Sequence, residues 1–171
     1  MVNKQLSHRN ELPILLQSLG LNNIGVEIGV GKGAYSYAIL LNNGLKLLYS
    51  VDNWDDSAIK AKAERTLDRF GDRNEILHTT SEEASKRFSN GSLDFVYIDA
   101  DHTYESIKRD LELWYPKVKK GGIFAGHDYI DRVCKYGTFG VKSAVNEMVD
   151  KHKQELFITK EHWPSWFLIK I

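Results

Sequence analysis

The segment Val26–Ser36, VEIGVGKGAYS, decides how the rest of the chain is interpreted. It has glycine at every second position, at Gly29, Gly31 and Gly33, and a glutamate, Glu27, two residues before the first of them. The residues before the glycines read IGVE, which is typical of a buried strand, and those after them are typical of a helix. Glycines in a strand-to-helix turn let a ligand lie against bare backbone, where helix N–H groups meet a phosphate or a carboxylate. The segment therefore predicts a ligand-binding turn.

Beyond this turn, short apolar runs alternate with helical patterns, which is typical of βαβ units and a parallel sheet. Five predicted strands belong to this alternation: IGVEIG, KLLYSVD, NEILHTT, LDFVYID and IFAGHD. Two further predicted strands, LFITKE and WFLIKI, close the chain with no helix between them. A short connection cannot make a parallel crossover, so this last pair is at least partly antiparallel. We predict an α/β fold: one Rossmann-like, doubly wound domain of seven strands over residues 1–171, with a helical N-terminal extension at residues 1–22.

The composition excludes several classes of protein. Lys and Arg together number 23, as do Asp and Glu, so the chain lacks the basic excess of a typical nucleic-acid-binding protein. Cys134 is the only cysteine, which rules out an intrachain disulfide and fits a reducing compartment. The first residues lack the apolar region of a secretory signal, and no apolar run approaches the length that spans a bilayer. We expect a cytoplasmic protein without nucleic-acid or membrane partners.

The residues after the second predicted strand bear on which ligand lies against the glycines. Gly29, Gly31 and Ala34 also match the dinucleotide fingerprint G-x-G-x-x-[GA], whereas the G-K-[ST] of a P-loop is absent. Asp52 ends that second strand in YSVDNW, where a carboxylate can bind both ribose hydroxyls of an adenosine. Because nicotinamide-dependent enzymes have an acid at the same place, Asp52 favours an adenosine cofactor without selecting one.

At this point the chain resembles the class I S-adenosylmethionine-dependent methyltransferases. The segments VEIGVGKGAYS, SVDNW, TTSEE and LDFVYIDADHTYESIKRDLELWYPKVKKGGIFAGHDY are similar to the successive motifs of that family, over roughly residues 24–150. The last segment is the most specific and resembles a bacterial small-molecule group related to catechol and caffeoyl-CoA O-methyltransferases. The resemblance implies strand order 3-2-1-4-5-7-6 with the last strand antiparallel.

The resemblance also implies residues that contact S-adenosylmethionine. Glu27 would hold the methionine amino group, Ser36 the methionine carboxylate and Asp52 the ribose. Trp54 and Ser81 would border the adenine. The full set of implied cofactor-binding residues is Glu27, Gly29, Gly31, Gly33, Ser36, Asp52, Asn53, Trp54, Ser81 and Asp99.

Acids and imidazoles follow the fourth and fifth predicted strands, in IDADH and GHDY. The carboxyl ends of neighbouring parallel strands meet at the edge of the sheet where ligands bind, so we expect these side chains to converge. The resemblance implies that Asp99, His127 and Asp128 hold a divalent metal. It also implies that His102 is the general base that removes the proton of an acceptor hydroxyl. The predicted catalytic residues are thus His102 and Asp99.

The central metal position departs from the family, in which it is usually Asp or Glu, because this chain has His127. Magnesium prefers oxygen ligands, and an imidazole shifts the preference towards manganese, iron, nickel or zinc. Two interpretations stay open. Either a metal other than magnesium binds, or no metal binds, Asp99 meets the cofactor amine and His127 and Asp128 share a hydrogen bond at a helix entry.

We therefore predict an S-adenosylmethionine-dependent enzyme that methylates a hydroxyl oxygen of a small molecule. The alternatives are an NAD(P)-dependent oxidoreductase and a non-catalytic adenosine-cofactor-binding protein. Acceptor selectivity would come from residues 1–22, from a lid loop at residues 129–140, or from a neighbouring subunit of a homo-oligomer.

Overall fold

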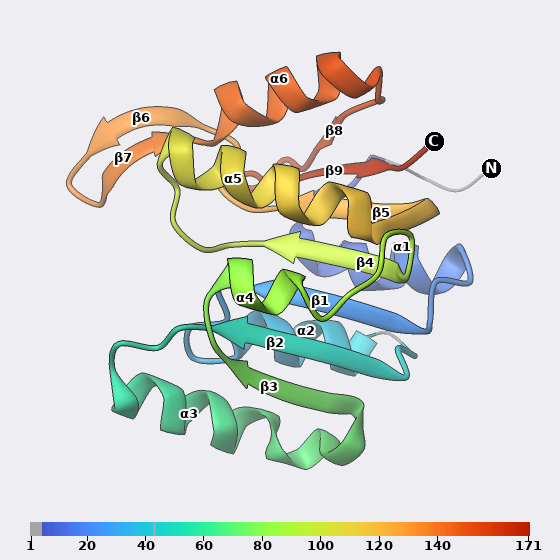
Figure 1. Cartoon of the computed structure of the whole chain (residues 1–171), viewed down its shortest axis with the longest axis vertical. Coiled ribbons are helices and arrows are strands. Elements are labelled where there is room, and N and C mark those ends of the chain that lie inside the picture. Colours follow the sequence, from blue (N-terminus) through green and yellow to red (C-terminus); the bar gives the residue numbers. More distant parts are fainter. Residues whose placement is uncertain (1–4, 43) are drawn as a thin grey trace.

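A computed structural model describes residues 5–42 and 44–171 of the chain and shows one mixed sheet covered by helices on both faces (Figure 1). The strand order is β3-β2-β1-β4-β5-β9-β8. The neighbours from β3 to β5 pair in parallel, whereas β9 is antiparallel to both β5 and β8. The strands of this sheet are β1 (Ile24–Ile28), β2 (Leu47–Asp52), β3 (Asn74–His78), β4 (Leu93–Ile98), β5 (Val118–Gly126), β8 (Phe157–Ile158) and β9 (Trp166–Ile169).

The helices divide between the two faces of the sheet. Those of one face are α1 (Leu12–Ser18), α2 (Ala34–Asn42) and α3 (Ser57–Leu67), and those of the other are α4 (Ser81–Ser85), α5 (Tyr104–Trp114) and α6 (Val141–His152). Short 3₁₀ turns complete the fold: η1 (Arg9–Glu11), η2 (Asp68–Arg73) and η3 (Tyr115–Lys117). Every residue of the central strand β4 is buried, as expected for a parallel strand with helices on both sides.

The predicted fold is confirmed, including the strand order and the antiparallel last strand. The prediction of a loop over residues 129–140 was wrong in part, because this segment contains an antiparallel hairpin outside the main sheet, β6 (Asp131–Cys134) and β7 (Gly137–Gly140). Gly137, at φ +125°, begins the returning strand. Within the described residues, none of the helices has both the length and the apolar character that a bilayer crossing needs.

Candidate active site

The glycine turn after β1 lies against the end of β4. The backbone N–H of Asp99 donates to the Ile28 carbonyl at 2.7 Å. Gly29 has φ +88°, and a Cβ atom at this position would lie 2.0 Å from the Asp99 carbonyl oxygen. Only glycine fits there, because both the backbone conformation and the close approach exclude a side chain. The turn and the first candidate catalytic residue are therefore fixed relative to each other.

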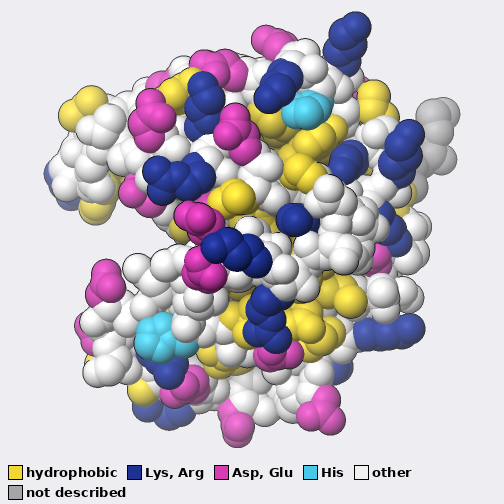
Figure 2. Space-filling view, in the orientation of Figure 1, with side chains coloured by type: hydrophobic (Ala, Val, Ile, Leu, Met, Phe, Trp, Pro, Cys, Tyr) yellow, Lys and Arg dark blue, Asp and Glu magenta, His cyan; other side chains and the backbone are white. Residues whose placement is uncertain are grey.

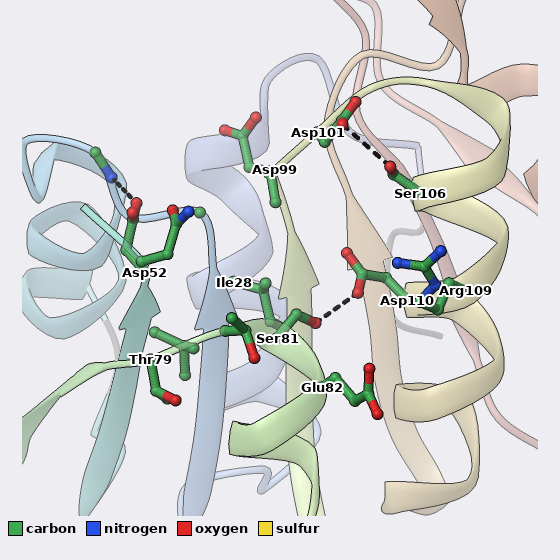
Figure 3. Close-up of a pocket in the computed structure, with 16 residues that line it drawn as sticks. Ile28, Asp52, Thr79, Ser81, Glu82, Asp99, Asp101, Ser106, Arg109 and Asp110 are labelled. Atoms are coloured by element: carbon green, nitrogen blue, oxygen red, sulfur yellow. Dashed lines mark hydrogen bonds between the residues drawn. The ribbon is translucent and has the colours of Figure 1, made fainter. Parts of the chain in front are cut away.

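A cavity of about 610 Å³ opens at the carboxyl edge of the sheet, beside this turn. The molecule is visibly hollowed at this edge (Figure 2), and Figure 3 shows the residues around the cavity. Six of the predicted cofactor-binding residues line it: Gly29, Gly31, Asp52, Asn53, Ser81 and Asp99. The other four predicted residues, Glu27, Gly33, Ser36 and Trp54, are not among its lining residues.

Both oxygens of the Asp52 carboxylate accept backbone hydrogen bonds. Oδ2 accepts from Gly31 N–H and Oδ1 from Trp54 N–H, each at 2.8 Å. The Trp54 side chain is buried, and its indole N–H donates to the Gly31 carbonyl at 2.7 Å. Trp54 thus ties the end of β2 to the glycine turn and orients Asp52 towards the cavity, rather than exposing its own ring there.

The α5 side of the cavity contains polar residues that the sequence analysis did not select. Ser81 donates to Asp110 Oδ1 at 2.5 Å (Figure 3). The Ser81 hydroxyl also accepts from the Trp114 indole N–H at 2.8 Å. Burial raises the pKa of Asp110. Ser106, Arg109 and Asp110 all line the cavity. Their spacing of three and four residues places them on one helical face, so helical periodicity applied to α5 would have identified them.

Glu27 lies behind the glycine turn and not on the cavity surface. It is 1% exposed, and its carboxylate accepts a hydrogen bond from Ser36, which is fully buried and also within 3.0 Å of Ser50. Burial raises the pKa of Glu27 to about 8, with the nearby charge of Asp99 adding to the effect and the Ser36 hydrogen bond opposing it. The two residues predicted to hold the methionine end of the cofactor therefore contact each other.

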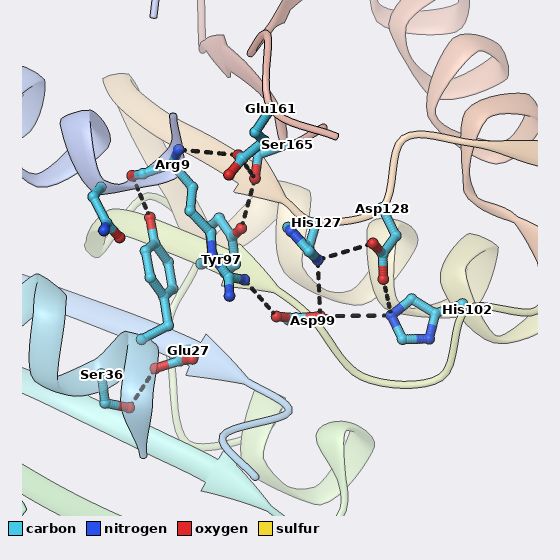
Figure 4. A network of polar contacts seen from close by, with 12 residues as sticks. Arg9, Glu27, Ser36, Tyr97, Asp99, His102, His127, Asp128, Glu161 and Ser165 are labelled. Atoms are coloured by element: carbon cyan, nitrogen blue, oxygen red, sulfur yellow. Dashed lines mark hydrogen bonds and ion pairs between the residues drawn. The ribbon is translucent and has the colours of Figure 1, made fainter. Parts of the chain in front are cut away.

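Asp99, His102, His127 and Asp128 form a compact group at the ends of β4 and β5, here called the acid–imidazole cluster (Figure 4). The Asp128 carboxylate lies between the two rings, with Oδ2 2.8 Å from His102 Nε2 and Oδ1 3.0 Å from His127 Nδ1. Asp99 Oδ1 is 3.5 Å from His102 Nε2 and 3.7 Å from His127 Nδ1. Four of the five predicted acids and imidazoles thus converge, whereas the Asp101 carboxylate accepts hydrogen bonds from Thr103 N–H and the Ser106 hydroxyl.

Charge interactions dominate the protonation of this cluster. Burial alone would lower the pKa of His102, but contacts with Asp128 and Asp99 outweigh it and raise the pKa to about 9. Burial would raise the pKa of Asp128, but the two imidazoles hold it well below its usual range. Asp128 also has φ +52°, a left-handed conformation that is costly for a residue other than glycine. Strain and pairing of this kind are typical of functional sites.

Arg9, in the N-terminal extension, is a further site residue that the sequence analysis missed. Its Nη1 atom donates to Asp99 Oδ2 at 2.9 Å, and its guanidinium lies 4.7 Å from the centre of the Tyr35 ring. Burial would lower the pKa of Arg9, but its interactions with Tyr97 and Asp99 outweigh burial and raise the pKa. Arg9 and Asp99 are 90 positions apart, and no local pattern connects them.

The fold and the cavity define a class I α/β architecture with a nucleoside-sized site at the carboxyl edge of its sheet. Residues 26–129 match the family described as "Methyltransferase domain". The chain belongs to this family, which confirms the resemblance drawn from its motifs.

Two relatives found by sequence are longer than this chain. The uncharacterized protein R132 of Acanthamoeba polyphaga mimivirus is 27% identical over 119 residues, which cover 62% of this chain and 51% of that protein. The ribosomal RNA small subunit methyltransferase H of Tropheryma whipplei (strain Twist) is 33% identical over 72 residues, which cover 42% of this chain and 22% of that enzyme. The chain thus spans about half of the first relative and less of the second.

Solved structures share the fold over nearly the whole chain. The O-methyltransferase from Bacillus cereus in complex with SAH has a TM-score of 0.69 at 15% identity, covering 94% of this chain and 80% of that one. The SAH-bound methyltransferase PaMTH1 from Podospora anserina has a TM-score of 0.70 at 12% identity, covering 94% of this chain and 76% of that one. At such low identity these likenesses concern the fold.

Proposed function

We propose that this chain uses S-adenosylmethionine to methylate a hydroxyl oxygen of a small molecule. The observation that carries the proposal is the cavity that joins the glycine turn and Asp52 to Asp99 of the acid–imidazole cluster. In the proposal the nucleoside lies against the glycines, its ribose binds Asp52, and its adenine lies near Ser81. The S-adenosylhomocysteine (SAH) named for two neighbours in fold, together with membership of the methyltransferase family, supports this cofactor.

The proposed reaction moves one methyl group. The bond between the methyl carbon and the sulfonium sulfur breaks as a bond to the acceptor oxygen forms, and the sulfur becomes the neutral thioether of S-adenosylhomocysteine. The hydroxyl proton passes to a base in the acid–imidazole cluster. Displacement needs the oxygen, the carbon and the sulfur in line, so the main contribution of the protein is to bring the two substrates together in that alignment.

The donor set of the cluster fits a divalent metal. Oxygens of Asp99 and Asp128 and a nitrogen of His102 all lie within 4.8 Å of one another. His102 Nε2 is buried and makes no well-directed hydrogen bond, as expected of a potential ligand atom. These three residues would hold the metal, and His127, 3.0 Å from Asp128, would orient that carboxylate. Two carboxylates and one imidazole favour manganese, iron or zinc over magnesium, and a bound metal supplies Lewis acidity that lowers the pKa of a hydroxyl.

His102 has two proposed roles that exclude each other. As the general base it must be neutral, whereas its pKa of about 9 keeps it protonated at neutral pH while both carboxylates face it. As a metal ligand it cannot also accept the proton. Manganese binding by His102→Ala separates the two: lost affinity identifies a ligand, and retained affinity with slowed methyl transfer identifies the base.

The β6–β7 hairpin is the proposed lid over the acceptor. Phe139 of β7 is buried, with its ring centre 4.9 Å from that of His102 and 5.5 Å from that of Trp163. The hairpin contacts the cluster through the Phe139 ring and through the backbone N–H of Gly140, which donates to the His102 carbonyl at 2.9 Å, while Val133 and Tyr136 remain exposed. Movement of Phe139 would open the side of the cluster to an acceptor.

Calorimetry with S-adenosylhomocysteine and with NAD tests the cofactor, and binding of NAD alone would overturn the proposal in favour of an oxidoreductase. Release of S-adenosylhomocysteine during turnover then tests the reaction, with a panel of catechols, sugars and hydroxy acids. A ribosomal RNA fragment belongs in the panel because of the relative in Tropheryma whipplei. The balanced net charge of the chain favours a small-molecule acceptor over RNA. Methylation of the RNA and of no small molecule would refute the proposal of a small-molecule acceptor.

A further inference from the structure

We propose that Arg9 and Asp99 together bind the amino-acid end of the cofactor. Arg9 binds the carboxylate of the cofactor, and Asp99 binds the ammonium group of the cofactor. The inference rests on the proposed function, because it concerns the same cofactor. The resemblance implied Ser36 and Glu27 for this role and gave Asp99 only as a further cofactor contact; Arg9 is the new residue.

The motif residues are badly placed for the task. Glu27 and Ser36 are 1% and 0% exposed and contact each other. Neither residue lines the cavity of about 610 Å³ at the sheet edge, here called the cofactor cavity, or the second cavity described below. A zwitterion at the glycine turn needs charged partners that it can reach. In the part of the chain that the structure describes, Asp99 and Arg9 meet that need at the turn itself.

The Arg9–Asp99 pair stands between two cavities. Asp99 lines the cofactor cavity, whereas Arg9 lines a second cavity of about 440 Å³, bordered also by Tyr35, His127 and Trp163. Figure 4 shows the Arg9 guanidinium reaching the carboxylate of Asp99, on the side of Asp99 that faces away from His102. S-adenosylmethionine with its nucleoside part in the first cavity would therefore direct its amino-acid end at this pair.

The pair is complementary in charge to an α-amino acid. The side chains of Arg9 and Asp99 are 26% and 21% exposed, so that a ligand can contact both. A guanidinium has five N–H donors and binds a carboxylate through two parallel hydrogen bonds. When the zwitterion enters, one internal ion pair is exchanged for two pairs with the ligand, and neither protein charge is left unpaired in a partly buried site.

The backbone of Arg9 is held independently of its side chain. Its N–H donates to Glu161 Oε1 at 3.0 Å, and its carbonyl accepts from the Tyr35 hydroxyl at 2.9 Å. Glu161 is in turn fixed by the hydroxyls of Thr159 and Ser165. Replacing the guanidinium therefore leaves the N-terminal segment attached, which makes Arg9 suitable for a binding test.

The test compares three ligands by calorimetry: S-adenosylhomocysteine, its decarboxylated analogue, and 5′-methylthioadenosine, which lacks the whole amino-acid end. We expect the wild type to bind S-adenosylhomocysteine at least about tenfold more tightly than the decarboxylated analogue, as a charge-assisted contact predicts. Arg9→Gln should bring the two affinities close together and leave 5′-methylthioadenosine binding unchanged. Arg9→Lys should fall between, and Arg65→Gln, which alters an exposed arginine of α3, should match the wild type.

Equal affinity of the wild type for the first two ligands would overturn the inference without the use of any variant. An Arg9→Gln protein that loses 5′-methylthioadenosine to the same degree as S-adenosylhomocysteine would also overturn it, since Arg9 would then support the fold of the whole site. Failure of the proposed function looks different: the wild type would bind none of the three ligands.

Discussion

Replacing Glu27 by glutamine should make the stability of the protein less dependent on pH. The ordinary pKa of this carboxyl is 4.5, and burial is the main reason that it rises to about 8 in the folded protein. Between these values the folded state retains a proton that the unfolded state has lost. The free energy of unfolding therefore falls as pH rises from about 4.5 to about 8 and is level above that.

The size of the effect follows from the two pKa values. At about 1.4 kcal/mol for each pH unit, the interval from 4.5 to about 8 corresponds to about 5 kcal/mol. Relaxation around the ionised carboxylate reduces this, so we expect a measured effect of about 2–5 kcal/mol. Glu27→Gln keeps a polar group beside Ser36 but cannot ionise. The variant should gain stability relative to the wild type by this amount between pH 5 and pH 9.

Urea denaturation of both proteins at a series of pH values measures this difference, and effects of all other titrating groups cancel in it to first order. Glu105→Gln, which replaces an exposed glutamate of α5, is the matched control and should show a flat difference. A constant difference between wild type and Glu27→Gln across the range would refute the reasoning. It would mean that water or a structural change relieves the burial of the carboxylate.

Three further outcomes are expected. Gly29→Ala should abolish S-adenosylhomocysteine binding, because its Cβ would lie 2.0 Å from the Asp99 carbonyl oxygen; calorimetry on the folded variant checks this. The NMR titration of His102 should give a pKa near 9 in the wild type and a clearly lower value in Asp128→Asn, and an unchanged value would exclude the ion pair as its cause. The contribution of protonated His102 to the free energy of unfolding is full below pH 6.5 and is lost as pH rises through about 9. A chelator should slow turnover by tenfold or more and added manganese should restore it, whereas unaffected turnover removes the metal from the mechanism.

Periodicity and turn chemistry were enough to predict the sheet. Alternating apolar and helical patterns identify βαβ units because each element must bury one face, and the lack of a helix between the last two strands requires an antiparallel pair. The hairpin at residues 131–140 was missed because its strands are only four residues long and mostly exposed, so that they show no clear alternation. A hairpin that is stabilised by hydrogen bonds between its own two strands, and not by burial, shows no clear pattern of apolar residues in the sequence.

The site was predictable where residues follow strand ends and unpredictable where contacts are long-range. Asp52 ends β2, Asp99 directly follows β4 and Asp128 comes two residues after β5, so the fold alone brings them to one edge. The burial of Glu27 against Ser36 depends on how α2 packs over β1, which a motif does not reveal. The approach of Arg9 to Asp99 depends on the path of the N-terminal segment across the sheet edge, and a single sequence contains no signal for that path.

Asp99 connects the two halves of the proposed reaction because its two carboxylate oxygens face different partners. Oδ2 contacts Arg9, on the side assigned to the cofactor, and Oδ1 faces His102 and His127, on the side assigned to the acceptor. Its backbone is held against the glycine turn by the hydrogen bond to Ile28 and the close packing at Gly29, which fixes the position from which the carboxylate reaches both sides. In the proposed reaction we therefore expect substitution of Asp99 to disturb cofactor binding and proton transfer together, and substitution of Arg9 or His102 to disturb one of the two. A mechanism that aligns cofactor and acceptor predicts these different effects of substitution at the three positions. A site in which charged residues merely lie close together does not predict them.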